Sequence, residues 1–242
     1  MIPLVHDFTD QTVLVFGGGR VGERKARRFA AEASVVVVSP DFTDGLAETH
    51  TAREATHETW SQSESTGPGI ELVRDAPTPD AVPDWIDRVD PALVVAATDS
   101  EEVNAAVATA ARARNVLVNR TDRAGERDVG SVVVPATVDD GTVSVAITTG
   151  GASPALSKYL RERLDGELAG AGAMADLTRE LRADLKTRDL TPTERRETMR
   201  RVVRSSRVWK ALRTGTTNAR KVAEDVIGIE TTNPSEPEHE RP

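Results

Sequence analysis

A glycine-rich stretch near the N-terminus, residues 12–33, constrains the fold of this chain more than any other feature. The apolar run Val13–Phe16 is short enough to be a buried strand, and it leads directly into consecutive glycines and a charged run with helical periodicity. Gly17, Gly19 and Gly22 match the spacing G-x-G-x-x-G. The pattern predicts a strand, a tight turn and a helix that starts within the motif.

Each glycine of this motif has a separate physical role. Gly17 makes the tight turn, Gly19 lets the backbone approach a pyrophosphate, and Gly22 lets the helix pack closely on the strand. The N-terminus of the helix then offers unpaired N–H groups and a partial positive charge to the phosphates. Because a second apolar run, Val35–Val38, closes a βαβ unit, we interpret the turn as a dinucleotide site rather than a purely structural turn.

The ends of the predicted strands supply candidate cofactor contacts. Asp41 follows the second strand near the place where an acidic residue grips the ribose hydroxyls, which favours NAD. Ser39 and the arginines nearby leave NADP open. The strand 91–98 ends in Thr98, and Asp99 follows it, at an end that lines the ligand crevice. On the first helix, Arg20, Arg24 or Lys25 is either near an anionic ligand or on a solvated face.

The order of predicted elements indicates an α/β fold with a doubly wound parallel sheet. A polar excursion over 43–69 follows the second strand, and further strands are expected at 70–73 and 116–118. Residues 131–134 and 142–148 then flank the turn signal Asp139–Gly141, so we expect an antiparallel hairpin between these two runs. The remainder is predicted to be helical. The first of these helices, 154–164, is expected to bury Leu156, Tyr159, Leu160 and Leu164, and Leu212 is placed on a helix that begins at Thr191.

Composition excludes several classes of function. The chain has no cysteine, so disulfides and cysteine nucleophiles are excluded. A formal net charge of −8 argues against general nucleic-acid affinity. We expect no membrane span and no signal peptide, and therefore a cytoplasmic location. His50 and His57 could share one helix face, but no third metal ligand accompanies them, so we interpret them as surface residues.

Two further segments are candidates for chemistry. Asn119–Asp122 follows the fifth strand, where the Asp122 carboxylate would be a proton acceptor near a nicotinamide or an ordinary loop residue. Residues 148–154 combine hydroxyls, the pair Gly150–Gly151 and a helix N-terminus capped by Ser153. This segment would bind an anion or would simply be a tight strand-to-helix turn.

Four runs of this sequence resemble the family of precorrin-2 dehydrogenases, which are NAD-dependent enzymes of siroheme synthesis. The runs are VLVFGGGRVGERKARRF (13–29), VVAATDSEEVN (94–104), VNRTD (118–122) and, most specifically, SVAITTGGASPALSKYLRERL (144–164). They occur in the family's order and spacing. The likeness to the family as a whole extends over residues 1–165. Some members of the family also insert Fe²⁺ into sirohydrochlorin.

The resemblance implies roles for particular residues. Asp122 matches the family's catalytic aspartate, and Arg20, Val21, Pro40 and Asp41 match its cofactor contacts. Thr149 matches a position beside the substrate that is usually serine. The implied contacts to the tetrapyrrole are Asn119, Thr149, Gly150, Gly151 and Ser153.

The resemblance also implies a Rossmann domain over 1–120, a small mixed dimerisation and active-site region over 121–155 and a helical domain over 156–230, in an intertwined homodimer. We expect residues 231–242 to be disordered. The expected activity is oxidation of precorrin-2 to sirohydrochlorin with NAD. Whether Fe²⁺ is also inserted, and with which residues, is left open. The alternatives are a protein that is mainly a chelatase and a non-catalytic NAD(H)-sensing module.

Overall fold

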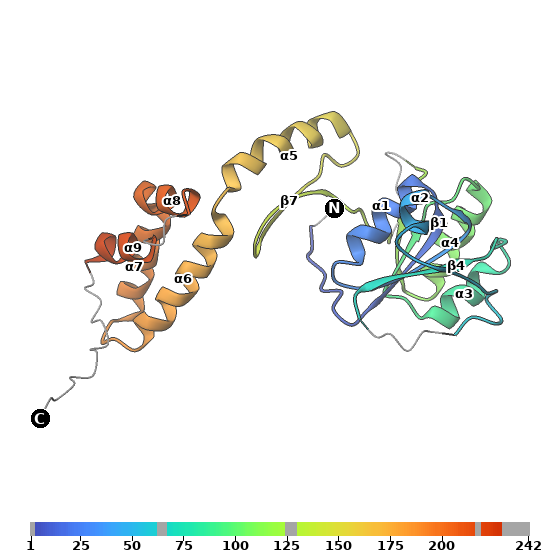
Figure 1. Ribbon diagram of the computed structural model, residues 1–242, viewed down its shortest axis with the longest axis horizontal. Coiled ribbons are helices and arrows are strands. Elements are labelled where there is room, and N and C mark those ends of the chain that lie inside the picture. The colour runs from blue at the N-terminus through green and yellow to red at the C-terminus, as the bar shows by residue number, and fades with distance from the viewer. Residues whose placement is uncertain (1–2, 62–66, 124–129, 216–218, 229–242) are drawn as a thin grey trace, which may run out of the picture. The chain divides into compact units, whose positions relative to one another are not determined.

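A computed structural model of the chain describes residues 3–61, 67–123, 130–215 and 219–228 (Figure 1). The chain divides into two compact units, residues 1–134 with 150–152, and residues 135–149 with 153–242. The predicted tail 231–242 and part of the excursion 43–69 lie outside the described residues. Our finer division at 120, 155 and 230 stays a prediction.

The first unit is a parallel six-stranded sheet with the strand order β3-β4-β2-β1-β5-β6. The chain starts in the middle of the sheet at β1, moves outward to one edge and then crosses to the other. This arrangement confirms the predicted doubly wound, Rossmann-like fold. The strands are β1 (Thr12–Gly18), β2 (Ser34–Phe42), β3 (Ala52–Glu54), β4 (Gly69–Arg74), β5 (Leu93–Ala96) and β6 (Leu117–Arg120).

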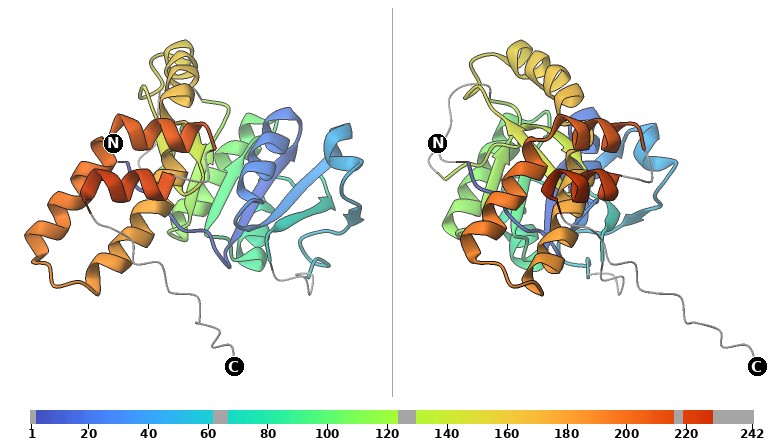
Figure 2. Two further views of the ribbon diagram at one scale, coloured as in Figure 1. Left: turned by 60° about the vertical axis from the view of Figure 1, so that its left-hand side comes forward. Right: turned by 90° about the vertical axis from the view of Figure 1, so that its left-hand side faces the viewer.

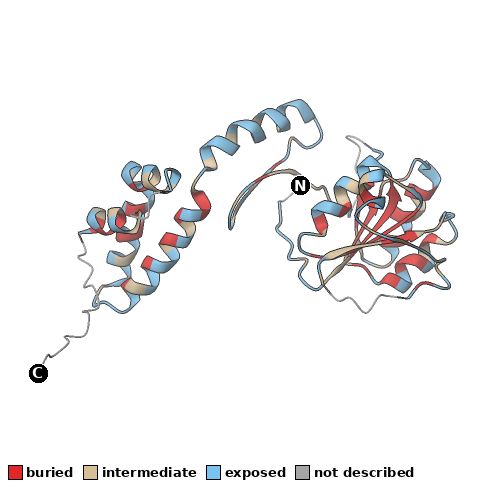
Figure 3. Cartoon of the chain, viewed as in Figure 1, coloured by how far each residue is buried: buried red, intermediate tan, exposed pale blue. Residues whose placement is uncertain are grey.

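Helices cover both faces of this sheet (Figure 2). Along β1, Val13 and Val15 pack towards one face, while Leu14 and Phe16 pack towards the other. Because both faces are buried, the central strands are continuously apolar rather than alternating, and they appear as the buried centre of the unit in Figure 3. The covering helices are α1 (Arg20–Phe29) and α2 (Asp44–Ala47) on one face and α3 (Val82–Val89) and α4 (Glu101–Ala113) on the other.

The predicted polar excursion contains more structure than its composition suggested. It begins with α2 and then adds β3 as an edge strand beside β4. His57 lies near the carboxylate of Asp84 at 3.5 Å. The described residues contain no group of three side chains suited to hold a metal ion.

The predicted hairpin exists, but its first arm was placed wrongly. It pairs β7 (Ala136–Asp140) with β8 (Val143–Ile147) across a two-residue turn, so the first strand runs directly into Gly141. Residues 131–134 belong to the first unit instead. Ser131 forms a bridge with Val118, and the Val132 N–H donates to the Val118 carbonyl at 2.8 Å.

The helix α5 (Pro154–Leu168) has no buried residue, which contradicts the burial predicted for four of its side chains. Leu156 is 46% exposed and Tyr159 is 54% exposed, and Leu160 and Leu164 are only half-buried. The pale ribbon of α5 in Figure 3 shows this exposure. The apolar spacing is present, but the described part of the chain covers this side of α5 only in part, and Leu156 and Tyr159 stay exposed.

The remaining helices form a small core of their own, with Met174, Leu177, Leu181, Met199 and Val202 at its centre. The prediction that Leu212 lies on the helix that begins at Thr191 is wrong. That helix ends at Arg204, and the Ser205 hydroxyl caps the next helix, which carries Leu212. No helix in the described ranges is long and apolar enough to cross a membrane. These helices are α6 (Ala171–Lys186), α7 (Pro192–Arg204), α8 (Ser206–Arg213) and α9 (Ala219–Ile227).

Candidate active site

The glycine turn between β1 and α1 is built as its sequence requires. Gly17 has a φ of +110°, and a Cβ placed there would lie 2.3 Å from the carbonyl oxygen of Ala97 on the neighbouring strand. A Cβ on Gly22 would lie 1.8 Å from the Gly17 carbonyl oxygen. Both positions therefore need glycine, one for the turn and one for helix packing. A Cβ on Gly19 would meet no atom within 4 Å, so that side of the turn is open.

A cleft of about 500 Å³ opens at this turn, along the carboxyl ends of the parallel strands. Among the predicted cofactor contacts, Arg20, Val21 and Gly22 form the first turn of α1 and lie outside the cleft's lining. The open glycine backbone and the helix N-terminus beside it suit a pyrophosphate. The predicted contacts that do line the cleft are Gly17, Gly19, Pro40, Asp41, Thr98 and Asp99.

Asp41 lines this cleft, and the guanidinium of Arg74 lies beside it. The Asp41 side chain is 97% exposed, and the nearest Arg74 nitrogen lies 3.9 Å from it. Arg74 is itself fixed by a hydrogen bond to the Pro40 carbonyl at 2.6 Å and by its position over the Phe42 ring. Asp41 is thus available to accept hydrogen bonds from ribose hydroxyls. These features fit a dinucleotide.

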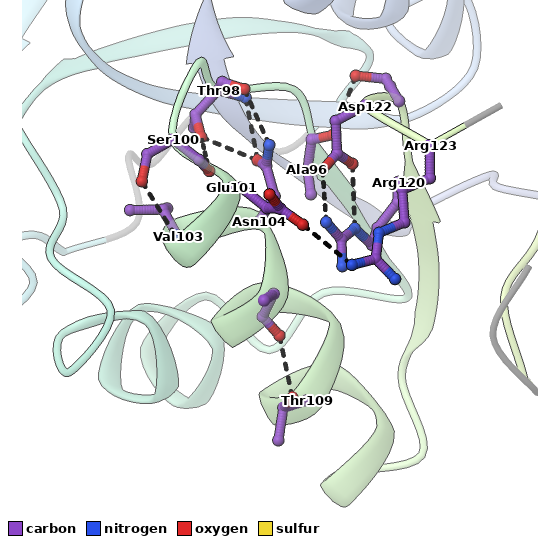
Figure 4. A network of polar contacts seen from close by, with 12 residues as sticks. Ala96, Thr98, Ser100, Glu101, Val103, Asn104, Thr109, Arg120, Asp122 and Arg123 are labelled. Atoms are coloured by element: carbon purple, nitrogen blue, oxygen red, sulfur yellow. Dashed lines mark hydrogen bonds and ion pairs between the residues drawn. The ribbon is translucent and has the colours of Figure 1, made fainter. Parts of the chain in front are cut away.

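Asp122 lies just after β6 and is held by an arginine from the same strand (Figure 4). Arg120 Nε donates to Asp122 Oδ1 at 3.0 Å, and Nη2 donates to Oδ2, so the pair is bidentate. The Arg120 side chain is 8% exposed and that of Asp122 is 22% exposed. Arg123 instead pairs with Glu101 at 3.0 Å. One carboxylate is therefore presented with its orientation fixed.

The electrostatics of Asp122 favour its ionised form. The Arg120 hydrogen bonds and charge lower the pKa of the Asp122 carboxyl below its ordinary value, and a hydrogen bond with Asn104 contributes in the same direction. Partial burial acts the other way but does not prevail. Asp122 is therefore a carboxylate throughout the physiological pH range.

Asn104 connects this carboxylate to the cofactor cleft. It is fully buried on α4, and its amide nitrogen donates to the Thr98 carbonyl at 2.9 Å. Its oxygen accepts from the Thr98 hydroxyl at 2.8 Å. Since Thr98 lines the cleft, the ends of β5 and β6 are fixed to each other on the side where the cofactor would bind.

Asn119, for which a substrate contact is predicted, is largely buried. It is 6% exposed, and its Nδ2 donates to the Val132 carbonyl at 2.8 Å, which fastens residues 130–134 to β6. Its Oδ1 is buried and has no hydrogen-bond partner among the described residues. A contact from Asn119 to substrate would therefore use this single oxygen.

The second predicted anion device, the turn at 149–153, has the expected local geometry. Gly150 and Gly151 have φ values of +66° and +90°, and Ser153 caps α5 through the Leu156 N–H. The Thr149 hydroxyl donates to the Ser153 carbonyl at 3.1 Å and accepts from its N–H at 3.2 Å. The Thr149 hydroxyl therefore stabilises the turn through its two hydrogen bonds with the Ser153 backbone.

Sequence reasoning missed Arg120 and Asn104. Arg120 could have been found, because residues two apart in an extended segment project to the same side, which pairs it with Asp122. Asn104 sits four residues after the cap of α4, a position that the sequence gives no reason to connect with Thr98.

On α1, burial and the neighbouring arginines lower the pKa of Lys25 to about 8.

Comparisons with known proteins agree with this geometry. A family model described as NAD(P)-binding matches residues 4–136, and one described as the central region of sirohaem biosynthesis proteins matches residues 140–167. A precorrin-2 dehydrogenase from Methanosarcina barkeri is 33% identical over 86% of this chain and 85% of its own length.

Two more relatives extend the comparison. A siroheme synthase from Tolumonas auensis is 34% identical over 80% of this chain, which spans only 37% of that longer protein. A solved structure described as SirC, precorrin-2 dehydrogenase, covers 93% of this chain and 98% of its own, with a TM-score of 0.62 and 22% identity. That structure supports the fold across both units.

Proposed function

This chain belongs to the precorrin-2 dehydrogenase family, and we propose on that premise that it oxidises precorrin-2 to sirohydrochlorin with NAD as the hydride acceptor. One observation carries the proposal. The glycine-lined cleft and the carboxylate of Asp122 stand at the ends of adjacent strands in one unit, joined through Asn104 and Thr98. A sensor of NAD(H) would need the cleft but would have no use for a fixed carboxylate beside it.

The cofactor would be held by the backbone of Gly17–Gly19, by the first amides of α1 and by Asp41 at its ribose. When bound, NAD supplies a hydride acceptor. The chain's own contribution is a turn whose backbone can approach the pyrophosphate closely, because neither Gly17 nor Gly22 could carry a Cβ without meeting a neighbouring carbonyl. Thr98 and Asp99 would border the nicotinamide end of the cofactor.

Asp122 would take up the proton that the substrate loses along with the hydride. A carboxylate with a lowered pKa is a weak base. This suits the step, because departure of a hydride leaves the macrocycle cationic and makes the remaining proton acidic. Arg120 keeps the carboxylate ionised and aimed, and solvent at the partly exposed Asp122 side chain receives the proton afterwards.

The turn 149–153 would bind carboxylate groups of the tetrapyrrole. Its consecutive left-handed glycines and the start of α5 offer N–H groups. Arg161 and Arg163 lie on the same helix, whereas Lys158 is paired with Glu162. We also propose that α5 pairs with a second copy of this chain, since its side chains Leu156 and Tyr159 are exposed. The protein would act in the cytoplasm.

An Asp122→Asn variant tests the mechanism. It preserves the shape of the side chain and its contact with Arg120 in part, so NAD should bind nearly as in the wild type, while NADH formation from precorrin-2 falls by about two orders of magnitude or more. Near-normal turnover would remove Asp122 from the mechanism. Incubating the wild type with sirohydrochlorin and Fe²⁺ measures the alternative activity, metal insertion, separately.

A further inference from the structure

The helices α7 and α8 form a strongly basic part of an otherwise acidic chain. Between Pro192 and Arg213 there are eight arginines and lysines but only two glutamates, a formal charge of +6, whereas the whole chain carries −8. Charge of one sign that is concentrated in a short segment produces a local field that attracts small anions. The Rossmann unit does not use this segment, and neither does the mechanism above.

Side chains of this segment surround a hollow of about 520 Å³ on the helical unit. Arg204, at the end of α7, lines it together with Trp209, Lys210 and Arg213 of α8. Arg204 also lines an adjoining hollow of about 340 Å³. The cations therefore surround a depression rather than being scattered over a convex surface.

The cations around this hollow lack carboxylate partners in the described part of the chain. Within the described residues, no carboxylate forms an ion pair with Arg204, Lys210 or Arg213. Arg220 on α9 shows the opposite arrangement, since it is paired with Glu180, Asp184 and Glu224. Cations held close together without counter-charges repel one another, and an anion that bridges them relieves this repulsion.

Trp209 gives the hollow a flat apolar wall. Its indole N–H donates to the Val203 carbonyl at 2.8 Å, and the guanidinium of Arg213 lies 5.8 Å from the ring centroid. The ring is thus fixed in orientation while it remains only half-buried. A fixed indole beside several cations suits a ligand that is both flat and polyanionic.

We propose that Arg204, Trp209, Lys210 and Arg213 form an auxiliary binding surface for a polycarboxylate tetrapyrrole, a claim that rests on the function proposed above. The macrocycle would lie against the indole, and its peripheral carboxylates would reach the three cations. The size of the hollow and the overall negative charge favour a compact ligand of this kind over an extended nucleic acid. Such a surface would retain an acidic substrate or product on the protein.

Calorimetric titration of the full-length protein with uroporphyrin, a stable tetrapyrrole polycarboxylate, tests the surface without turnover. The variant Lys210→Gln/Arg213→Gln should lose one binding equivalent per chain, or weaken it by about fivefold, as expected for the loss of two exposed charge contacts. The matched control Arg195→Gln/Arg196→Gln removes the same charge from α7 outside the hollow and should bind as the wild type does. Raising the ionic strength should weaken the same equivalent.

Three outcomes would overturn the proposal. The first two are that uroporphyrin binds both double variants as tightly as it binds the wild type, and that it does not bind the wild type. Equal weakening in the two variants would indicate attraction by net charge alone and would also reject the site. Assaying NADH formation from precorrin-2 with the same preparations separates the claims. If the wild type turns over precorrin-2 but Lys210→Gln/Arg213→Gln binds uroporphyrin as the wild type does, only the auxiliary surface is rejected. An absence of turnover by the wild type would reject the proposed function.

Discussion

At the scale of single residues, the chemistry depends on how one carboxylate is held. Asp122 alone would be an ordinary loop aspartate, but the bidentate contact with Arg120 and the buried Asn104 behind it give it a fixed direction and a lowered pKa. A group whose folded pKa is lowered stabilises the protein above its unfolded pKa and loses that contribution as the pH falls through the folded value. The pair should therefore stabilise the folded protein at neutral pH and lose that contribution in acid, while it matters for activity at every working pH.

An Arg120→Leu variant should move the acidic limb of the pH profile. Without the cation and its hydrogen bonds, burial raises the pKa of the Asp122 carboxyl, so kcat/KM should begin to fall at a pH about one unit higher than in the wild type. Arg123→Leu is the matched control, because that arginine pairs with Glu101. If the two variants have the same acidic limb, Arg120 does not control the ionisation of Asp122.

At the scale of elements, the β1–α1 turn determines whether the cofactor cleft can form. Substitutions of the motif's glycines should have different effects, because an added Cβ would touch other protein atoms at only some of these positions. Gly22 meets the backbone of Gly17, whereas Gly19 faces open space. Substitutions at these two positions therefore separate folding from cofactor binding.

Gly22→Ala should destabilise the first unit by about 2 kcal/mol or more, because the added methyl group forces α1 away from β1. Gly19→Ala should leave the thermal midpoint almost unchanged but weaken NAD binding, since its Cβ would project into the space where we place the pyrophosphate. Thermal unfolding and NAD titration of both variants check this. Wild-type affinity in Gly19→Ala would mean that the dinucleotide does not approach that side of the turn.

The sequence predicted elements well where the local pattern and the tertiary contacts agree. The run 13–16 reads as a buried strand because both of its faces are covered by helices from the same chain. The hairpin's first arm was misplaced because residues 131–134 are as apolar as a strand of the hairpin would be, and only their pairing with β6 distinguishes them. The pairing of Asp122 with Arg120 follows from strand alternation, whereas the contact of Asn104 with Thr98 depends on how α4 packs on the sheet.

At the scale of the whole molecule, the exposed apolar side of α5 is the feature that the single chain leaves unexplained. Its periodicity predicted burial, and the described part of the chain leaves Leu156 and Tyr159 exposed. Side chains such as Leu156 and Tyr159 would lose contact with water if a second copy packed on them, which would stabilise such an assembly. We therefore expect α5 to become buried in a homodimer.

Leu156→Arg/Tyr159→Arg should convert the dimer to a monomer, as measured by light scattering after size-exclusion chromatography. The charged side chains cannot be desolvated in an interface without a large cost. Arg161→Ala/Arg163→Ala, on the same helix, should remain dimeric. A wild-type protein that is monomeric at micromolar concentration would contradict the role proposed for α5.

The central claim is that this chain oxidises precorrin-2 with NAD, and anaerobic turnover of the wild type tests it most directly. Purified protein is mixed with precorrin-2 and NAD, and absorbance is followed for both NADH and the more conjugated product. We predict that NADH and sirohydrochlorin form in equal amounts until the substrate is exhausted. A folded preparation that binds NAD yet produces neither species, with NAD or with NADP, would contradict the account.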